Sequence, residues 1–216
     1  MRNKNKKGGI KLYAKYKKKT DKELQQLVLN DDFYAINELG ERLFQKEKYT
    51  DALKYFEKAF ILGSDMAVNN IGFYYLEICN NLEVAEKYFF KAQKMGNIIS
   101  LNNLGIINDR RENYEEAIKY YQMAIEKKCK FAYNNLGNLY EEVYQNYEKA
   151  EKLYRKNFKE TGDTDALINL SYLYLNYYHN KKKAIKYLKF SSKKGNNEAE
   201  HILYHLLNNE ICNCND

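Results

Sequence analysis

Four side chains near the C-terminus have the types and spacing that could bind a metal ion. His201 and His205 are four residues apart, which places both imidazoles on one face of a helix, and Cys212 and Cys214 follow. Two imidazoles and two thiolates form a tetrahedral zinc site in many proteins, but there the cysteines are separated by two to four residues. The alternative is an exposed helix face followed by a frayed tail. We expect no metal ion and no other cofactor, and keep these four residues as a weak candidate site.

Motifs of common enzyme classes are absent from the sequence. It contains no G-x-x-x-x-G-K-[ST], G-x-G-x-x-G, G-x-S-x-G or H-E-x-x-H. Carboxylates are plentiful, but they alternate with lysines on polar helix faces, as in Glu57-Lys58 and Glu148-Lys149. We therefore predict a protein without enzymatic activity and without a small-molecule substrate.

A period of about 33 residues organises the chain. Small residues recur at this spacing where helices are expected to end: Gly63, Gly96, Cys129, Gly162 and Gly195. An alanine recurs near the start of the same helices: Ala52, Ala85, Ala117, Ala150 and Ala184. A third set lies one helix earlier: Gly40, Gly72, Gly105, Gly137 and Ser171. Such a period is typical of stacked helix pairs, and glycines inside helices indicate close approach of a neighbouring helix.

The repeat predicts an all-α fold, a right-handed solenoid of five helix-turn-helix repeats with a capping helix at each end. Residues 1–19 are expected to form a basic disordered tail, residues 20–208 the solenoid, and residues 209–216 a C-terminal tail. The first helix of each pair, helix A, is expected at 33–46, 67–80, 99–111, 131–145 and 165–179. The second, helix B, is expected at 50–62, 82–95, 114–127, 147–159 and 181–194.

Two kinds of segment resemble known repeat families. The strings YNNLGNLYEE and YEEAIKYYQMAIEK are similar to tetratricopeptide repeats, and the helix ends KAQKMGNIIS and SSKKGNNEA resemble Sel1-like repeats. The resemblance covers residues 20–208 and implies a fold that presents a concave groove to other proteins. The sequence departs from the pattern at Ser171, which replaces a glycine, at Asn157, which replaces Ala or Ser, and at Cys129, which replaces a turn glycine.

Asparagines precede the small residue of helix A in each repeat. In tetratricopeptide repeats, the residues two and three before this position and the one after it can face the groove. The resemblance therefore implies a peptide-binding groove with these candidates: Asn69, Asn70, Phe73, Asn102, Asn103, Asn134, Asn135, Asn138, Asn169 and Tyr172. An amide can pair with a peptide backbone because it has both a donor and an acceptor. The alternative is a structural ladder, in which the asparagines bond to each other and to neighbouring helices.

The charge is concentrated at the N-terminus. The net charge is +7, but residues 1–19 contain nine basic residues and no acidic one, and the rest of the chain contains 27 basic and 29 acidic residues. We therefore expect a scaffold or adaptor whose groove binds a protein partner. The alternative is a protein that binds nucleic acid or an anionic membrane through residues 1–19. Irregularly placed cysteines and the lack of a secretory signal predict a cytoplasmic location.

Overall fold

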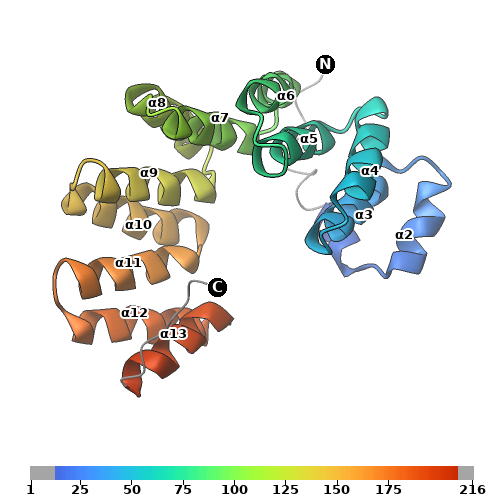
Figure 1. Cartoon of the computed structure of the whole chain (residues 1–216). Helices are drawn as coiled ribbons and strands as arrows, with labels where there is room; N and C mark the ends of the chain where they lie inside the picture. Colours follow the sequence, from blue (N-terminus) through green and yellow to red (C-terminus); the bar gives the residue numbers. More distant parts are fainter. Residues whose placement is uncertain (1–12, 209–216) are drawn as a thin grey trace. The chain divides into compact units, whose positions relative to one another are not determined.

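The computed structural model describes residues 13–208, which contain twelve α-helices and no strand. Five helix pairs are flanked by one helix at each end, which confirms the predicted all-α solenoid of repeats (Figure 1). The flanking helices are α2 (Asp21–Val28) and α13 (Asn197–Leu207). The A helices are α3 (Phe33–Gln45), α5 (Asp65–Glu77), α7 (Ile99–Arg110), α9 (Lys130–Glu142) and α11 (Asp165–Asn176). The B helices are α4 (Tyr49–Ile61), α6 (Leu82–Met95), α8 (Tyr114–Glu126), α10 (Tyr147–Thr161) and α12 (Lys181–Lys193).

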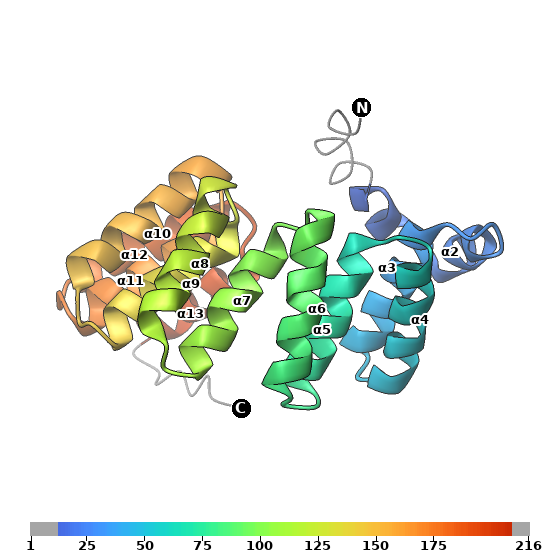
Figure 2. The same ribbon diagram turned by 90° about the horizontal axis from the view of Figure 1, so that it is seen from above.

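The chain divides into two compact units, Met1–Ile107 (unit 1) and Asn108–Asp216 (unit 2). In unit 1, α2, α3, α4, α5 and α6 each pack on the next helix along the chain, and Figure 2 shows α3 to α6 side by side. In unit 2, the helices from α8 to α13 pack in the same sequential way. Within each unit, these neighbouring helices therefore bury their apolar stripes against each other, as expected for a solenoid.

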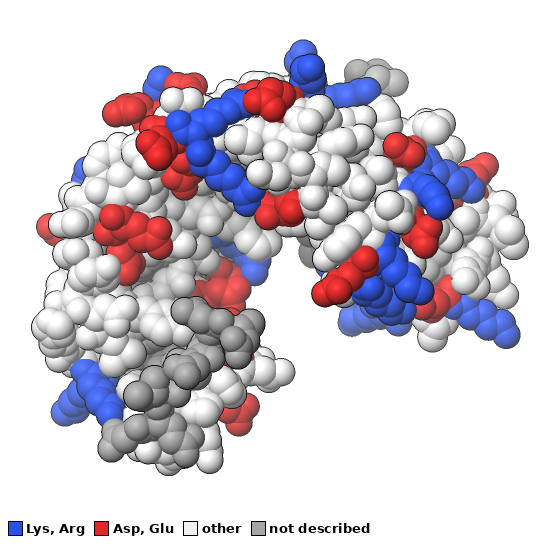
Figure 3. All heavy atoms as spheres, in the orientation of Figure 1, with Lys and Arg blue, Asp and Glu red and all other residues white. Residues whose placement is uncertain are grey.

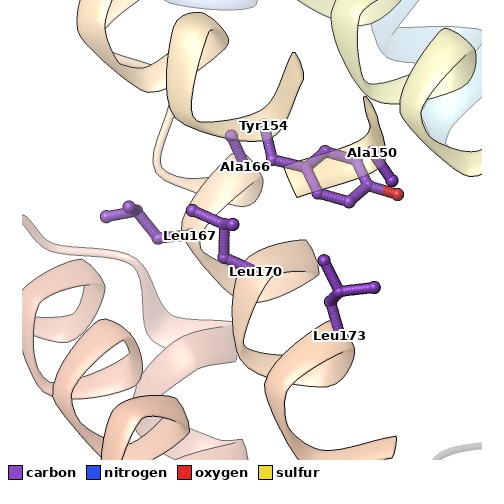
Figure 4. Packing of buried hydrophobic residues seen from close by; sticks show 6 residues of the cluster. All are labelled: Ala150, Tyr154, Ala166, Leu167, Leu170 and Leu173. Atoms are coloured by element: carbon purple, nitrogen blue, oxygen red, sulfur yellow. The ribbon is translucent and has the colours of Figure 1, made fainter. Parts of the chain in front are cut away.

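The core of unit 2 shows how the layers are filled. Figure 4 shows six buried side chains gathered between α10 and α11: Ala150, Tyr154, Ala166, Leu167, Leu170 and Leu173. Alanines lie where the helices approach closely, and the tyrosine ring and the leucines fill the space between them. The repeat alanines are fully buried in every repeat.

The mid-helix glycines of the A helices make room for an aromatic ring of helix B. The pairs are Gly40 with Phe56, Gly72 with Phe89, and Gly137 with Tyr154. A Cβ atom added at Gly40 would lie 2.6 Å from the Cε1 atom of Phe56, closer than packed carbon atoms can approach. The sequence predicted a close contact at these glycines but assigned it to a neighbouring helix as a whole rather than to a ring.

The fifth repeat exchanges both members of this pair. Ser171 takes the place of the glycine and Leu188 takes the place of the ring, and both side chains are buried. The Ser171 hydroxyl donates a hydrogen bond of 2.6 Å to the carbonyl oxygen of Ile168, so its polar atom is satisfied inside the core. A larger side chain on helix A is thus accompanied by a narrower one on helix B.

The turns between helices A and B end helix A earlier than the sequence predicted in three repeats. Each of the five turns contains a non-glycine residue with positive φ: Glu47, Asn80, Glu112, Gln145 and His179. These residues adopt the left-handed conformation that glycine usually supplies, so no glycine marks the turn in the sequence. Consequently α5, α9 and α11 end three residues before the predicted positions.

Three polar residues that follow a turn cap the next helix. The side chains of Ser64, Asn97 and Asn196 accept hydrogen bonds from backbone N–H groups at the start of the following helix. Asp163 does not cap α11. Its carboxylate is buried and accepts a hydrogen bond of 2.8 Å from the Nζ atom of Lys130.

Cys129 does not occupy the position of a turn glycine. Lys128 has the positive φ of this turn, at 59°, and Cys129 follows it as the N-cap residue of α9. Burial raises the pKa of the Cys129 thiol. The recurring small residue is therefore displaced by one position in this repeat.

The N-terminal boundary of the fold differs from the prediction. Residues 13–19 pack on the first repeat, with η1 (Tyr16–Lys18) as a 3-10 helix, rather than forming part of a disordered tail. Tyr13 and Tyr16 are buried against Leu24 and α3. The sequence assigned this segment to the basic tail because four of its seven residues are lysines, although the other three include two tyrosines. The remaining predicted tails, residues 1–12 and 209–216, lie outside the described residues.

Candidate functional site

The asparagines predicted for unit 1 form hydrogen bonds with each other between A helices. The Nδ2 atom of Asn103 donates to Oδ1 of Asn69 at 3.0 Å, and Nδ2 of Asn102 donates to Oδ1 of Asn103 at 3.3 Å. All three side chains are buried. This chain of amides links α5 to α7.

A second chain of polar groups lies beside the first. The Nδ2 atom of Asn70 donates to Oδ1 of Asn37 at 3.1 Å and to Oε1 of Glu41 at 3.2 Å. Asn37 is fully buried, and its own Nδ2 donates to the Tyr13 hydroxyl at 3.0 Å and to Glu41 at 3.0 Å. This network connects the N-terminal segment, α3 and α5. The 33-residue spacing of Asn37 and Asn70 was visible in the sequence, but it fits a ladder and a groove equally well.

In unit 2, Asn134 belongs to a buried network that also explains the unusual Asn157. The Nδ2 atom of Asn157 donates to Oδ1 of Asn134 at 2.9 Å and to Oδ2 of Asp163 at 3.1 Å. Asn134 donates to the same carboxylate at 3.1 Å, and Lys130 pairs with it at 2.8 Å. Sequence reasoning missed this network because Asn157 and Asp163 come from helix B and the following turn.

The other predicted amides differ in their surroundings. The Oδ1 atom of Asn138 accepts a hydrogen bond of 2.7 Å from the Tyr154 hydroxyl, which also lies 2.9 Å from Oε2 of Glu141. Burial raises the pKa values of both Tyr154 and Glu141. Asn135 and Asn169 are half-buried, and the Asn169 side chain makes no hydrogen bond to any residue in the range 13–208.

The two predicted aromatic residues are accessible. Phe73 and Tyr172 each follow the small residue of helix A, and each is 37% exposed. The Phe73 ring lies 5.8 Å from the Phe44 ring between centroids, so one side of it is packed and the other faces solvent. Burial, followed by the nearby Glu198 carboxylate, raises the pKa of Tyr172. The structure thus leaves these two aromatic side chains partly accessible, whereas most of the neighbouring amides already have partners.

The weak metal candidate is described only in part. The Nε2 atoms of His201 and His205 lie 3.1 Å apart on α13. Cys212 and Cys214 lie outside the described residues. Within residues 13–208, no group of three or more His, Cys, Asp or Glu side chains is arranged to hold a metal ion.

Replacing Asn103 by alanine is expected to lower the free energy of unfolding by about 1–3 kcal/mol. The substitution leaves the Oδ1 atom of Asn69 buried without its donor, which carries the full desolvation penalty of that group. Asn169→Ala is the matched control and should change stability by less than about 0.5 kcal/mol, because that side chain is half-buried and lacks a hydrogen bond. Urea denaturation measures both; equal effects would contradict the structural role of Asn103.

The fold and its repeat define a class of protein, the helical-repeat proteins built from stacked helix pairs. Within this class, the tetratricopeptide repeat family matches residues 34–63 and 98–130, which lie over the first and third helix pairs. No curated protein sequence matches the chain.

Several solved structures share the fold. A Sel1 repeat protein from Oxalobacter formigenes is 25% identical, with a TM-score of 0.51 over 77% of this chain and 74% of that one. A putative Sel1 repeat protein from Klebsiella pneumoniae is 18% identical, with a TM-score of 0.59 over 87% and 99%. A chain of the APC/C hetero-tetramer Cut9–Hcn1 is 18% identical, with a TM-score of 0.58. The match covers 82% of the present chain but only 36% of the length of that one. The chain therefore has the helical-repeat fold of tetratricopeptide and Sel1-like repeat proteins.

Proposed function

We propose that this protein is a non-enzymatic scaffold that binds a segment of a partner protein on the A helices of its repeats. Proteins built from tetratricopeptide and Sel1-like repeats generally serve as scaffolds for protein–protein interaction. Our proposal is more specific than this general role, because it names the binding surface. That surface comprises the A-helix faces around Phe73 in unit 1 and around Tyr172 in unit 2.

The exposure of these two aromatic residues carries the proposal. The residue after the small position of helix A is an aromatic side chain in two repeats, and over a third of each remains accessible although the adjoining helix surface is tightly packed. Partly exposed aromatic side chains on a rigid surface are typical anchors of protein interfaces, because they bury a large area with little loss of conformational freedom. The half-buried Asn138 and Asn169 lie nearby on A helices and could add polar contacts to a peptide backbone.

The amide networks have a supporting role in this proposal. They hold adjacent A helices in fixed positions, so that a partner meets a surface that is already ordered. A preorganised surface loses less entropy on binding, which strengthens association without additional contacts. The free thiols of Cys79 and Cys129 are compatible with the proposed cytoplasmic location. None of the helices in residues 13–208 is long and apolar enough to cross a membrane.

Site-specific photo-crosslinking in the native cell tests the proposed surface. A photoreactive phenylalanine placed at Phe73 or Tyr172 is expected to capture a partner protein, and Phe73→Ala or Tyr172→Ala should weaken binding of that partner about tenfold or more. The controls are the same probe at Ile61 and Met123, which are exposed apolar residues on B helices. A partner captured only from the control positions would place the interface on the B helices instead.

A further inference from the structure

The net charge of the chain conceals a strongly basic helix in unit 2. Residues 20–208 contain 27 basic and 27 acidic residues and are neutral as a whole. However, no acidic residue occurs between Asp165 and Glu198, and this interval contains seven lysines, all of them in residues 181–194. In Figure 3, a group of basic side chains stands near the start of α12 without an acidic neighbour on the face drawn.

Four of these lysines form a straight row along α12. They recur at i, i+4, i+7 and i+11, and we call them the lysine row: Lys182, Lys186, Lys189 and Lys193. All four are exposed, while the opposite face of α12 buries Ala184, Leu188 and Ser191. At 1.5 Å per residue the row is roughly 16 Å long. The row therefore presents its charge on one side of the helix, away from the core.

The lysine row lacks the acidic partners found on other B helices. Ion pairs occur on α4 between Asp51 and Lys54 at 3.0 Å, on α8 between Glu116 and Lys119 at 2.7 Å, and on α10 between Glu148 and Lys152 at 2.6 Å. Within residues 13–208, no lysine of the row forms an ion pair.

The first turn of α12 adds to this imbalance. It consists of three consecutive lysines, Lys181 to Lys183, placed at the positive end of the helix dipole. Repulsion among these charges opposes folding of α12. Three adjacent positive charges at this end of a helix are unfavourable, which indicates a function for that surface.

We propose that the lysine row of α12 docks unit 2 on an anionic lipid bilayer. Four to eight lysines on one exposed helix face are typical of surfaces that bind anionic lipids, and each lysine near such a leaflet strengthens binding about fivefold. Lipid headgroups can rearrange around flexible lysine side chains, so no fixed spacing is required. Phe190, on the flank of the row and 46% exposed, offers an apolar side chain to the interface. This surface is separate from the A-helix faces of the proposed function.

The packing of α12 argues against nucleic acid as the ligand. A major groove about 12 Å wide admits a protruding helix, but α12 packs against α11 and α13, and its Phe190 ring lies 5.6 Å from the Phe158 ring of α10. Single strands bind where bases can stack on aromatic side chains in a basic groove, whereas this face presents lysines on the outside of a helix.

An acidic peptide fits the lysine row less well than a bilayer. An exposed ion pair strengthens binding by at most about fivefold and requires each carboxylate to match a lysine in position. A charged leaflet acts on every lysine near it, including Lys181, Lys183 and Lys194 beside the row. The bilayer therefore uses more of the available charge.

Vesicle co-sedimentation of the full chain tests this proposal. Phosphatidylcholine vesicles with and without phosphatidylserine are the probes, and the variant replaces all four lysines of the row by glutamine. The matched control makes the same change in charge at exposed lysines without ion pairs elsewhere: Lys22, Lys48, Lys87 and Lys94. The wild type and the control are expected to bind only the vesicles that contain phosphatidylserine, more weakly as salt is added. The row variant should lose at least about tenfold in partition coefficient.

Three outcomes would overturn the proposal. If the wild type does not bind the anionic vesicles, the row has no affinity for lipid. If both variants lose binding equally, net charge or residues 1–19 account for it rather than α12. If the row variant binds vesicles normally but loses affinity for an oligonucleotide or for polyglutamate in a fluorescence anisotropy assay, the row serves that polyanion instead. Circular dichroism spectra of both variants are the control for folding, and they should match the spectrum of the wild type.

Discussion

Replacing Gly137 by leucine is expected to lower the free energy of unfolding by about 3 kcal/mol, even though leucine favours helix formation over glycine. A Cβ atom at this position meets the Tyr154 ring. The ring cannot easily move away, because it is fully buried and its hydroxyl is held by Asn138 and Glu141. The side chain must therefore push α9 and α10 apart, and the cost of overpacking exceeds the gain in helix propensity. Urea denaturation of the two proteins measures the difference.

A double-mutant cycle can separate this effect from a general intolerance of α9. The fifth repeat combines Ser171 with Leu188, so the natural counterpart in the fourth repeat is Gly137→Ser with Tyr154→Leu. Each single substitution is expected to destabilise the protein. The loss in free energy of unfolding of the double variant should be smaller, by about 1 kcal/mol or more, than the sum of the two single losses. The reason is that the narrower leucine leaves room for the serine. Additive effects would show that the glycine does not accommodate the ring.

The repeat pattern predicted most of the fold, because small residues recur at regular intervals along the chain. The alanines and glycines that recur every 32–34 residues located all five pairs, and α6 begins and ends at the predicted residues. The turns between helices A and B were less accurate, since residues such as Asn80 and His179 adopt positive φ only because the surrounding helices require it. Local sequence contains no signal for such a tertiary constraint.

The candidate site was predictable only in position. The sequence located the asparagines on the A helices, but whether an amide faces a ligand or another amide depends on side chains far away in the chain. Asn103 reaches Asn69 across 34 residues, and Asn157 reaches Lys130 across 27. The lysine row was overlooked for a different reason: charge summed over the whole solenoid cancels, whereas charge summed over α12 alone does not.

Removing residues 1–19 is expected to destabilise unit 1 by about 3 kcal/mol or more. A chain that begins at Thr20 lacks Tyr13 and Tyr16, which are buried against Leu24 and α3, and loss of one large buried aromatic side chain alone costs about 3–5 kcal/mol. The chain also loses the hydrogen bond between the Tyr16 hydroxyl and Asp32, at 2.7 Å. Hydrogen exchange of the amides in α2 and α3, together with urea denaturation, measures the effect.

Arg42 would be affected most directly by this truncation. Its Nη2 atom donates to the carbonyl oxygens of Tyr16, Lys17 and Lys19 at 3.4, 3.3 and 2.7 Å, and these acceptors hold the segment on α3. A chain that begins at residue 12 keeps every one of these contacts and is the matched control. The double substitution Tyr13→Ala and Tyr16→Ala in the full chain should reproduce most of the loss without changing the charge. If the chain that begins at Thr20 is as stable as the full chain, the two tyrosines and their contacts with Arg42 contribute nothing to stability. Residues 1–19 would then be dispensable for folding. If instead the loss appears as expected, the four lysines of residues 13–19 belong to the folded surface of unit 1, and the expectation of a basic tail applies only to the five basic residues before them.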